Sequence, residues 1–191
     1  MQAGEGGVIV YEKASLREES IILNTLRRLF KPGIVREFFN GKHILVARAK
    51  RLEVFLVTDR MLELIVKIKK VGREPYCTGV FIGILREKRG RLTFRPSLDV
   101  MERLFQKAKM NAVIVTAKAE QLVLYGRDVL VEGVLDILPP IREYTLIVNE
   151  NLEVLALGKP IYKPEKWKVL DPKTPVVKNL IDKGWYLRRG G

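Results

Sequence analysis

The stretch that decides the fold is residues 119–130, AEQLVLYGRDVL, read together with residues 182–189, DKGWYLRR. The first begins with good helix formers, and Gly126 follows them where a left-handed helix cap belongs. In the second stretch, a glycine is followed by two aromatic residues, a leucine and two arginines. Because an alternating apolar hairpin lies between the two, the pattern predicts a small closed β-barrel with one helix packed on it.

Outward from these clusters, the C-terminal half of the chain reads as short strands around one helix. Asn149-Glu150-Asn151 separates two apolar runs and predicts a hairpin, and Gly133 inside a strand-like run predicts a bulge. Residues 158–173 read as a connection that contains lysines and prolines. The expected helix is 118–125, and the expected strands are 112–116, 129–137, 144–148, 152–157, 176–179 and 185–188.

The N-terminal half alternates helical periodicity with strand-like runs. Ser15 and Glu18 form a capping-box pattern, and Lys31-Pro32-Gly33 ends the helix that follows it. Asn40-Gly41 favours positive φ at both positions, which predicts a hairpin turn. The expected strands are 34–39, 42–48, 53–57, 78–85 and 91–95. Two more helices are expected. One follows Thr58 or Asp59, with Met61, Leu62, Ile65 and Ile68 facing inward, and the other follows Ser97.

These patterns predict an α+β chain of two domains. Residues 1–108 form an N-terminal antiparallel sheet with helices, and residues 109–191 form the barrel. One cysteine and one histidine exclude an internal disulfide, a cysteine-rich zinc site and most histidine-based catalytic constellations. We expect no membrane span and, without a signal-peptide pattern, a cytoplasmic location.

The quoted motifs resemble those of PUA domains, which are compact RNA-binding modules. The likeness runs through the Ala119-Glu120 pair, the Gly126 turn, the following Asp-Val-Leu and the closing Gly-x-Tyr-Leu-Arg. With the domain before it, the chain resembles the archaeal and eukaryotic Nip-type factors of large-ribosomal-subunit biogenesis. From residue 79 onward motifs carry this likeness, whereas residues 1–75 match in layout and length only.

The resemblance implies a C-terminal PUA-type pseudo-β-barrel and a non-catalytic RNA-binding factor that needs no cofactor. The RNA partner would be large-subunit pre-rRNA, with uridine-rich RNA as a candidate ligand. Other ribosome-assembly proteins would bind through the N-terminal domain.

The charge of the chain independently points to a polyanion. The formal net charge is +13, which is high for 191 residues. Residues 108–158 hold four Lys and Arg against seven Asp and Glu, whereas residues 159–191 hold nine against three. A uniformly solvated surface does not predict this switch, and it places the expected RNA contact in the last segment of the barrel.

Within that segment the resemblance implies basic side chains near the last strand, where residues 174–181 offer only Lys178. Tyr162 and Trp167 interleave with nearby lysines and could stack on bases, although Trp167 could instead cover the barrel edge. The predicted RNA-binding residues are Lys163, Lys166, Lys168, Lys173, Lys178 and Trp167, with Lys118, Arg127 and Arg188 as further candidates. Arg188 has an alternative role in pairing with an acidic side chain.

Two basic clusters lie in the N-terminal domain, and each is either a solvated turn or a contact to RNA or protein. They are Arg48, Lys50 and Arg51, and Arg86, Lys88, Arg89 and Arg91.

Two alternative functions stay open. One is a translation-associated PUA adaptor that binds transfer RNA or the small subunit. The other is an RNA-modification enzyme whose catalytic Asp lies in the first domain, where Asp59 and Asp99 stand at expected helix starts. His43 and Cys77 have no catalytic partner beside them in the sequence, so we expect a surface role for His43 and a buried one for Cys77.

Overall fold

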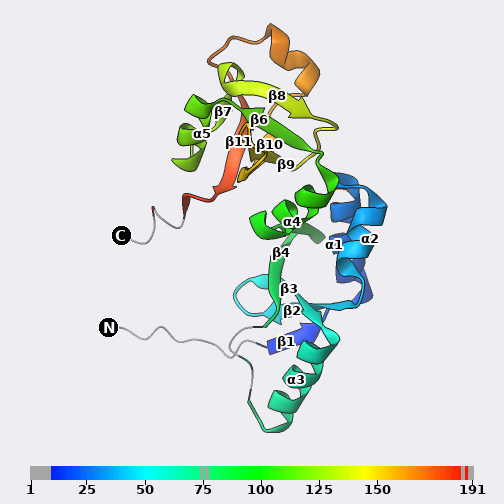
Figure 1. Ribbon diagram of the computed structural model, residues 1–191. Helices are drawn as coiled ribbons and strands as arrows, with labels where there is room; N and C mark the ends of the chain where they lie inside the picture. Colours follow the sequence, from blue (N-terminus) through cyan, green and yellow to red (C-terminus); the bar gives the residue numbers. More distant parts are fainter. Residues whose placement is uncertain (1–9, 74, 76–77, 186–187, 189–191) are drawn as a thin grey trace, which may run out of the picture. The chain divides into compact units, whose positions relative to one another are not determined.

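The computed structural model describes residues 10–73, 75, 78–185 and 188 of the chain (Figure 1). It divides into two compact units. The N-terminal unit runs to Arg27 and resumes over Pro32–Val100, and the C-terminal unit holds Arg28–Lys31 and the chain from Met101 onward. Among the described residues, no helix has both the length and the apolar character needed to cross a membrane. Cys77, and therefore its expected burial, lies outside the described residues.

The N-terminal unit is built on one antiparallel sheet with the strand order β1-β2-β3-β4-β5. One face of this sheet joins helix α3 through a core of Tyr11, Leu45, Ala47, Val57 and Ile65. The elements are β1 (Val10–Lys13), α1 (Leu16–Leu29), α2 (Pro32–Phe39), β2 (Lys42–Arg48), β3 (Leu52–Thr58), α3 (Asp59–Lys70), β4 (Val80–Lys88) and β5 (Arg91–Pro96), followed by α4 (Leu98–Ala108).

The predicted capping box at the start of α1 is confirmed. The Ser15 amide donates to Glu18 Oε2 at 2.8 Å, and the Glu18 amide donates to Ser15 Oγ at 3.3 Å. Arg48, at the end of β2, donates to both Glu18 oxygens at 3.1 Å. Burial raises the pKa of Glu18, but the hydrogen bonds from Arg48 and Ser15 outweigh it, so the pKa lies below its ordinary value. The box therefore ties α1 to the sheet.

Three expectations in this unit are wrong. Residues 34–39 belong to helix α2 and not to a strand, because Pro32 occupies the first helical position, where its missing N–H is not needed. Gly41, at φ +65°, follows the end of this helix and does not form a hairpin turn. In α3, Ile65 is buried as expected, but Met61 is 37% exposed.

The C-terminal unit is a curled six-stranded sheet with the order β7-β11-β10-β9-β6-β8, and α5 packs against it (Figure 1). Strands β6 and β9 run parallel, and the other neighbours are antiparallel. Its core includes Val113, Val123, Ile147, Ala156 and Val177. The elements are β6 (Ala112–Val115), α5 (Ala117–Leu124), β7 (Val129–Leu130), η1 (Val131–Gly133), β8 (Val134–Leu138), β9 (Thr145–Val148), β10 (Val154–Pro160), η2 (Pro164–Val169) and β11 (Pro175–Asp182).

Two further expectations in this unit need correction. The run 129–137 is not one strand with a bulge, because the 3₁₀ turn η1 divides it into β7, which pairs with β11, and β8, which pairs with β6. Trp185 and Arg188 are helical and not extended, and the Arg188 amide donates to the Gly184 carbonyl at 3.2 Å. Tyr186 and Leu187 between them lie outside the described residues. Gly126 has the predicted left-handed backbone, with φ +83°.

Candidate nucleic-acid interface

Two lysines stand directly opposite one another in the β10–β11 pair, near the end where a loop connects the two strands. In the antiparallel register, Lys159 of β10 faces Lys178 of β11, and both side chains are exposed. Opposed side chains rise from the same side of a sheet with their Cβ atoms about 5 Å apart, so like charges there destabilise the ladder. The pair therefore concentrates positive charge without stabilising the folded protein.

The four other lysines predicted from the same segment lie on the chain that joins these two strands. Lys163 precedes the 3₁₀ helix η2, Lys166 and Lys168 lie in it, and Lys173 follows it. All four are exposed. Because β10 and β11 are neighbours, the loop is closed at its base by the Lys159–Lys178 pair. We call these six lysines the lysine loop.

Trp167 anchors the lysine loop from within. Its ring is only 6% exposed and belongs to the apolar core of the unit, and Nε1 donates to the Tyr162 carbonyl at 3.0 Å. Trp167 is therefore a core residue that fixes the loop and not a platform on which a base stacks. Tyr162, 40% exposed, is the aromatic side chain of this loop that a base can reach.

A hydrogen-bond network fixes β11 where it carries Lys178. The side-chain amide of Asn179 donates to the carbonyls of Val123, at 2.9 Å, and Arg127, at 3.3 Å. Its backbone amide donates to Asp128 Oδ1 at 2.8 Å. These bonds join β11 to the end of α5 and the turn after it, so Lys178 projects from a rigid frame and loses little backbone freedom when it binds a ligand.

Arg188 is held in an ion pair, the alternative role considered for it. Nη1 and Nη2 donate to the two carboxylate oxygens of Asp182 at 3.0 and 2.8 Å, and Nη1 also donates to the Leu124 carbonyl. The hydrogen bonds to Asp182 raise the pKa of the Arg188 guanidinium. Because Asp182 is buried and would lose its partner, Arg188 serves the structure of this unit and is not a free cation for phosphate.

Lys118 and Arg127 are not part of the chain that joins β10 and β11; they lie at the start of α5 and in the turn after it. Lys118 borders a cavity of about 170 Å³ that is also lined by Asp128 and Glu132. Two carboxylates beside one ammonium group disfavour a phosphate in this cavity. Arg127 is exposed in the turn after α5, and only its backbone carbonyl, which accepts from Asn179, is used in the network.

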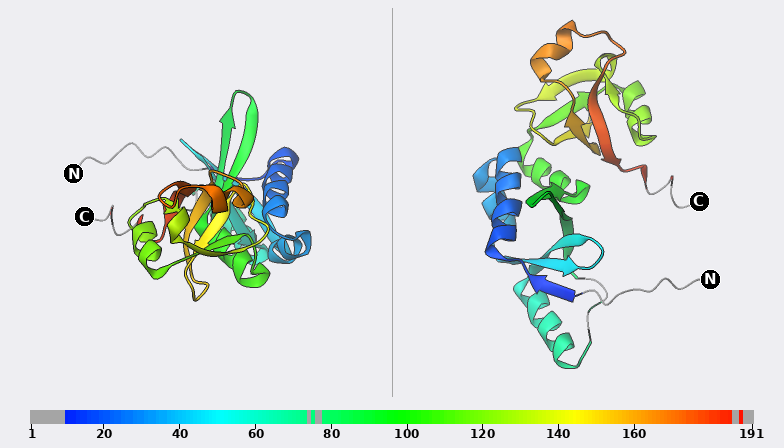
Figure 2. Two further views of the ribbon diagram at one scale, coloured as in Figure 1. Left: turned by 90° about the horizontal axis from the view of Figure 1, so that it is seen from above. Right: turned by 180° about the vertical axis from the view of Figure 1, so that it is seen from behind.

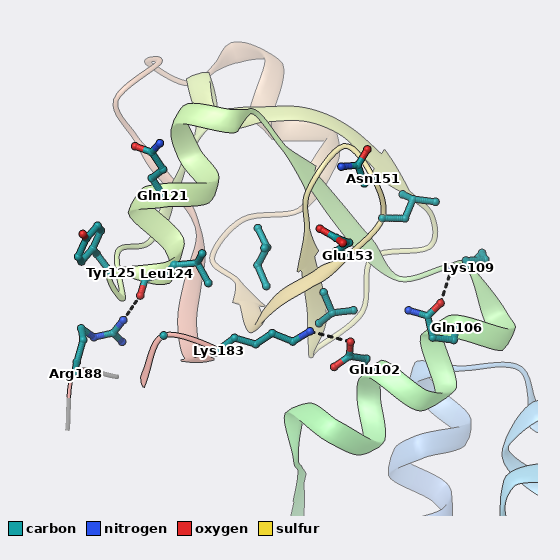
Figure 3. A pocket seen from close by; sticks show the side chains of 14 residues that line it. Glu102, Gln106, Lys109, Gln121, Leu124, Tyr125, Asn151, Glu153, Lys183 and Arg188 are labelled. Carbon is teal, nitrogen blue, oxygen red and sulfur yellow. Dashed lines mark hydrogen bonds and ion pairs between the residues drawn. The ribbon is translucent and has the colours of Figure 1, made fainter. Parts of the chain in front are cut away.

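A larger groove, of about 1210 Å³, lies among α4, α5 and the residues that follow β11 (Figure 3). Its cations are already engaged. Lys183 Nζ pairs with Glu102 at 2.9 Å, Lys109 Nζ donates to Gln106 Oε1 at 2.9 Å, and Arg188 is held by Asp182. The groove therefore offers mixed polarity, whereas the ammonium groups of the lysine loop make no ion pair with any residue that the structure describes.

The lysine-rich segment that begins at Lys159 could be recognised from charge, although Lys159 was not among the predicted RNA-binding residues, and Trp167 and Arg188 were predicted for roles that their surroundings do not favour. The place of Lys159 opposite Lys178 could not be predicted, because which residue faces Lys178 depends on how β10 and β11 pair. The structure brings Lys163, Lys166, Lys168, Lys173 and Lys178 together with Lys159 on one loop and its base.

Comparison with known proteins identifies the C-terminal fold. Residues 111–191 match the family model described as the UPF0113 PUA domain. Two archaeal relatives, each called UPF0113 protein, are similar in sequence. The Aeropyrum pernix protein is 29% identical over all of both chains, and the Archaeoglobus fulgidus protein is 27% identical over 80% of this chain and 82% of its own.

Solved structures agree with this assignment. A hypothetical protein from Pyrococcus horikoshii is 18% identical, with a TM-score of 0.62 over 93% of this chain and 99% of its own. A conserved PUA domain protein from Thermoplasma acidophilum is 17% identical, with a TM-score of 0.58 over 95% and 99%. The predicted fold class is confirmed: an α+β N-terminal unit with an antiparallel sheet is followed by a PUA-type domain.

Proposed function

We propose that this protein binds RNA through the lysine loop of its PUA domain. The observation that carries the proposal is the pair of exposed lysines, Lys159 and Lys178, held directly opposite each other with four more lysines on the loop that joins them. A phosphate between the two ammonium groups would relieve this repulsion. In addition, each phosphate that a lysine neutralises releases condensed counterions, which favours binding. The network around Asn179 keeps the base of the loop rigid.

A single-stranded nucleic acid is favoured over polyanions without bases by the aromatic side chain on the same loop. Tyr162 is 40% exposed beside Lys163, so a splayed base can stack on its ring while a neighbouring phosphate meets the ammonium group. Such an arrangement suits single-stranded RNA, whose unpaired bases can turn outward and stack on a protein side chain. Uridine-rich RNA is the preferred candidate ligand.

At the level of the cell, we place the protein among the large-subunit ribosome-biogenesis factors of the Nip type, acting on pre-rRNA without catalysis. The supporting features are the order of the two units, an α+β unit followed by a PUA domain, and the resemblance of the sequence motifs to those of that family. The surface described above binds and orients RNA through ammonium groups, so its part is to hold RNA for other assembly proteins. This role places the protein in the cytoplasm.

The proposal is tested by measuring RNA affinity over a series of salt concentrations. The full-length protein and the variant K163Q/K166Q/K168Q/K178Q are each titrated against a fluorescent uridine-rich single strand. With about 0.7 counterions released per phosphate contact, the negative slope of log K against log salt should become shallower by about 3 in the variant. The control, R17Q/R27Q/R36Q, removes three exposed arginines of α1 and α2 and should keep the wild-type slope. Equal slopes in wild type and lysine variant would contradict the proposal.

A further inference from the structure

One end of the N-terminal sheet collects cations from two turns that are far apart in the sequence. Strand β2 ends at Arg48 and β3 begins at Leu52, so Lys50 and Arg51 lie in the turn between them. Leu52 pairs with Leu85, and β4 continues from there to Lys88 before β5 returns from Arg91. The β2–β3 turn is therefore next to the point where the β4–β5 hairpin leaves the sheet.

The hairpin has a defined geometry. It extends beyond the neighbouring strand β3, and Figure 2 (left) shows it projecting from its sheet. Arg89 and Gly90 form the tip with φ values of +52° and +72°, as a tight two-residue hairpin turn requires. Arg86 faces Thr93, and Arg91 is two residues from Thr93, so the side chains of Arg86 and Arg91 lie on the same face.

The structure separates the cations at this end of the sheet into engaged and free ones. Arg48 is engaged by Glu12 and Glu18, and their hydrogen bonds raise its pKa. By contrast, five cations are exposed and make no ion pair within the described part of the chain: Lys50, Arg51, Arg86, Arg89 and Arg91. No exposed large apolar side chain is found among the described residues of the hairpin between Arg86 and Thr93. Charge without an apolar centre is typical of a surface that binds a nucleic-acid backbone and not of a stable protein interface.

We propose that the surface formed by these five cations, which we call the arginine hairpin, is a second binding surface for the phosphate backbone of RNA. The inference rests on the proposed RNA binding of the PUA domain and extends it to the N-terminal unit. Arginines in a fixed strand register present planar donor groups that fit phosphate oxygens, and the unpaired charge attracts a polyanion. The contact carries no base readout. It lengthens the RNA that one molecule holds and raises affinity through the effective concentration of the second contact.

The test uses the full-length protein and the variant R86Q/R89N/R91Q. Asn replaces Arg89 because asparagine tolerates the left-handed backbone at this position. On a uridine-rich single strand long enough to reach both units, the loss of three phosphate contacts should make the negative slope of log K against log salt shallower by about 2. On a strand of a few nucleotides, which occupies the lysine loop alone, the variant should bind as the wild type does.

Each outcome decides between the two claims. If the lysine variant makes the slope shallower and the hairpin variant does not, the inference is overturned and the PUA proposal stands. If R17Q/R27Q/R36Q makes the slope as shallow as the hairpin variant does, the effect is a general loss of charge and the inference is again overturned. If the wild type does not bind RNA, the proposed function fails and the second surface fails with it. The thermal unfolding of each variant is compared with wild type to verify that the hairpin change leaves the fold intact.

Discussion

Exchanging both Lys159 and Lys178 for glutamate should weaken RNA binding by about 100-fold at moderate salt. The change removes two phosphate contacts from the base of the lysine loop and replaces them with two carboxylates that repel the backbone. The pair stands in register on β10 and β11, so the two new charges face the RNA from the same place as the two they replace. Fluorescence anisotropy with a uridine-rich single strand measures the effect.

The single variant K178E separates binding from folding. It converts a like-charged cross-strand pair into an opposite-charged one, which should stabilise the domain by roughly 0.2–1 kcal/mol. RNA affinity should fall in the same variant because one phosphate contact is lost and a repulsive charge is added. A protein that unfolds more easily and still binds RNA as tightly as wild type would contradict the assignment of this surface.

The substitution Asn111→Leu should destabilise the C-terminal unit by about 4 kcal/mol. Asn111 is fully buried, and its side-chain amide donates to the Tyr144 carbonyl at 2.8 Å and the Leu29 carbonyl at 3.3 Å. Its Oδ1 accepts from the Arg142 amide at 3.0 Å. Leucine leaves these three backbone groups without their partner. It also strains the backbone, because the φ of +60° suits asparagine and disfavours a larger apolar residue.

Both tryptophans of the chain lie in the C-terminal unit, so urea unfolding followed by tryptophan fluorescence reports on this unit. Asn151→Ala is the matched control, because Asn151 is exposed in the turn between β9 and β10 and should change stability by less than about 0.5 kcal/mol. A midpoint for Asn111→Leu equal to that of the control would contradict the structural role of Asn111.

Local hydrogen-bonding signals were read correctly from the sequence. The capping box at Ser15 and the helix caps at Thr58 and Ser97 were predictable because donor and acceptor lie within a few residues of each other. The same local reading failed at Asn40-Gly41. A pair that favours positive φ ends a helix as readily as it makes a hairpin, and only the packing of α2 decides between them.

In the candidate site, too, some features could be predicted from the local sequence and others depend on folding. Its lysines were predictable from charge, since six of them lie between residues 159 and 178. Which side chains are free to bind was not predictable, because that depends on partners brought together by folding. Asp182 and the Leu124 carbonyl hold Arg188, the core encloses Trp167, and strand register alone brings Lys159 to Lys178.

Crosslinking with RNA that contains 4-thiouridine tests the central claim most directly. After irradiation of the full-length protein with this RNA, mass spectrometry of the digested complex locates the crosslinked peptides. We expect the most abundant crosslinks within residues 159–178, with Tyr162 among the modified positions because its ring is the exposed aromatic of the loop. Crosslinks at other surfaces with none in residues 159–178 would contradict the account.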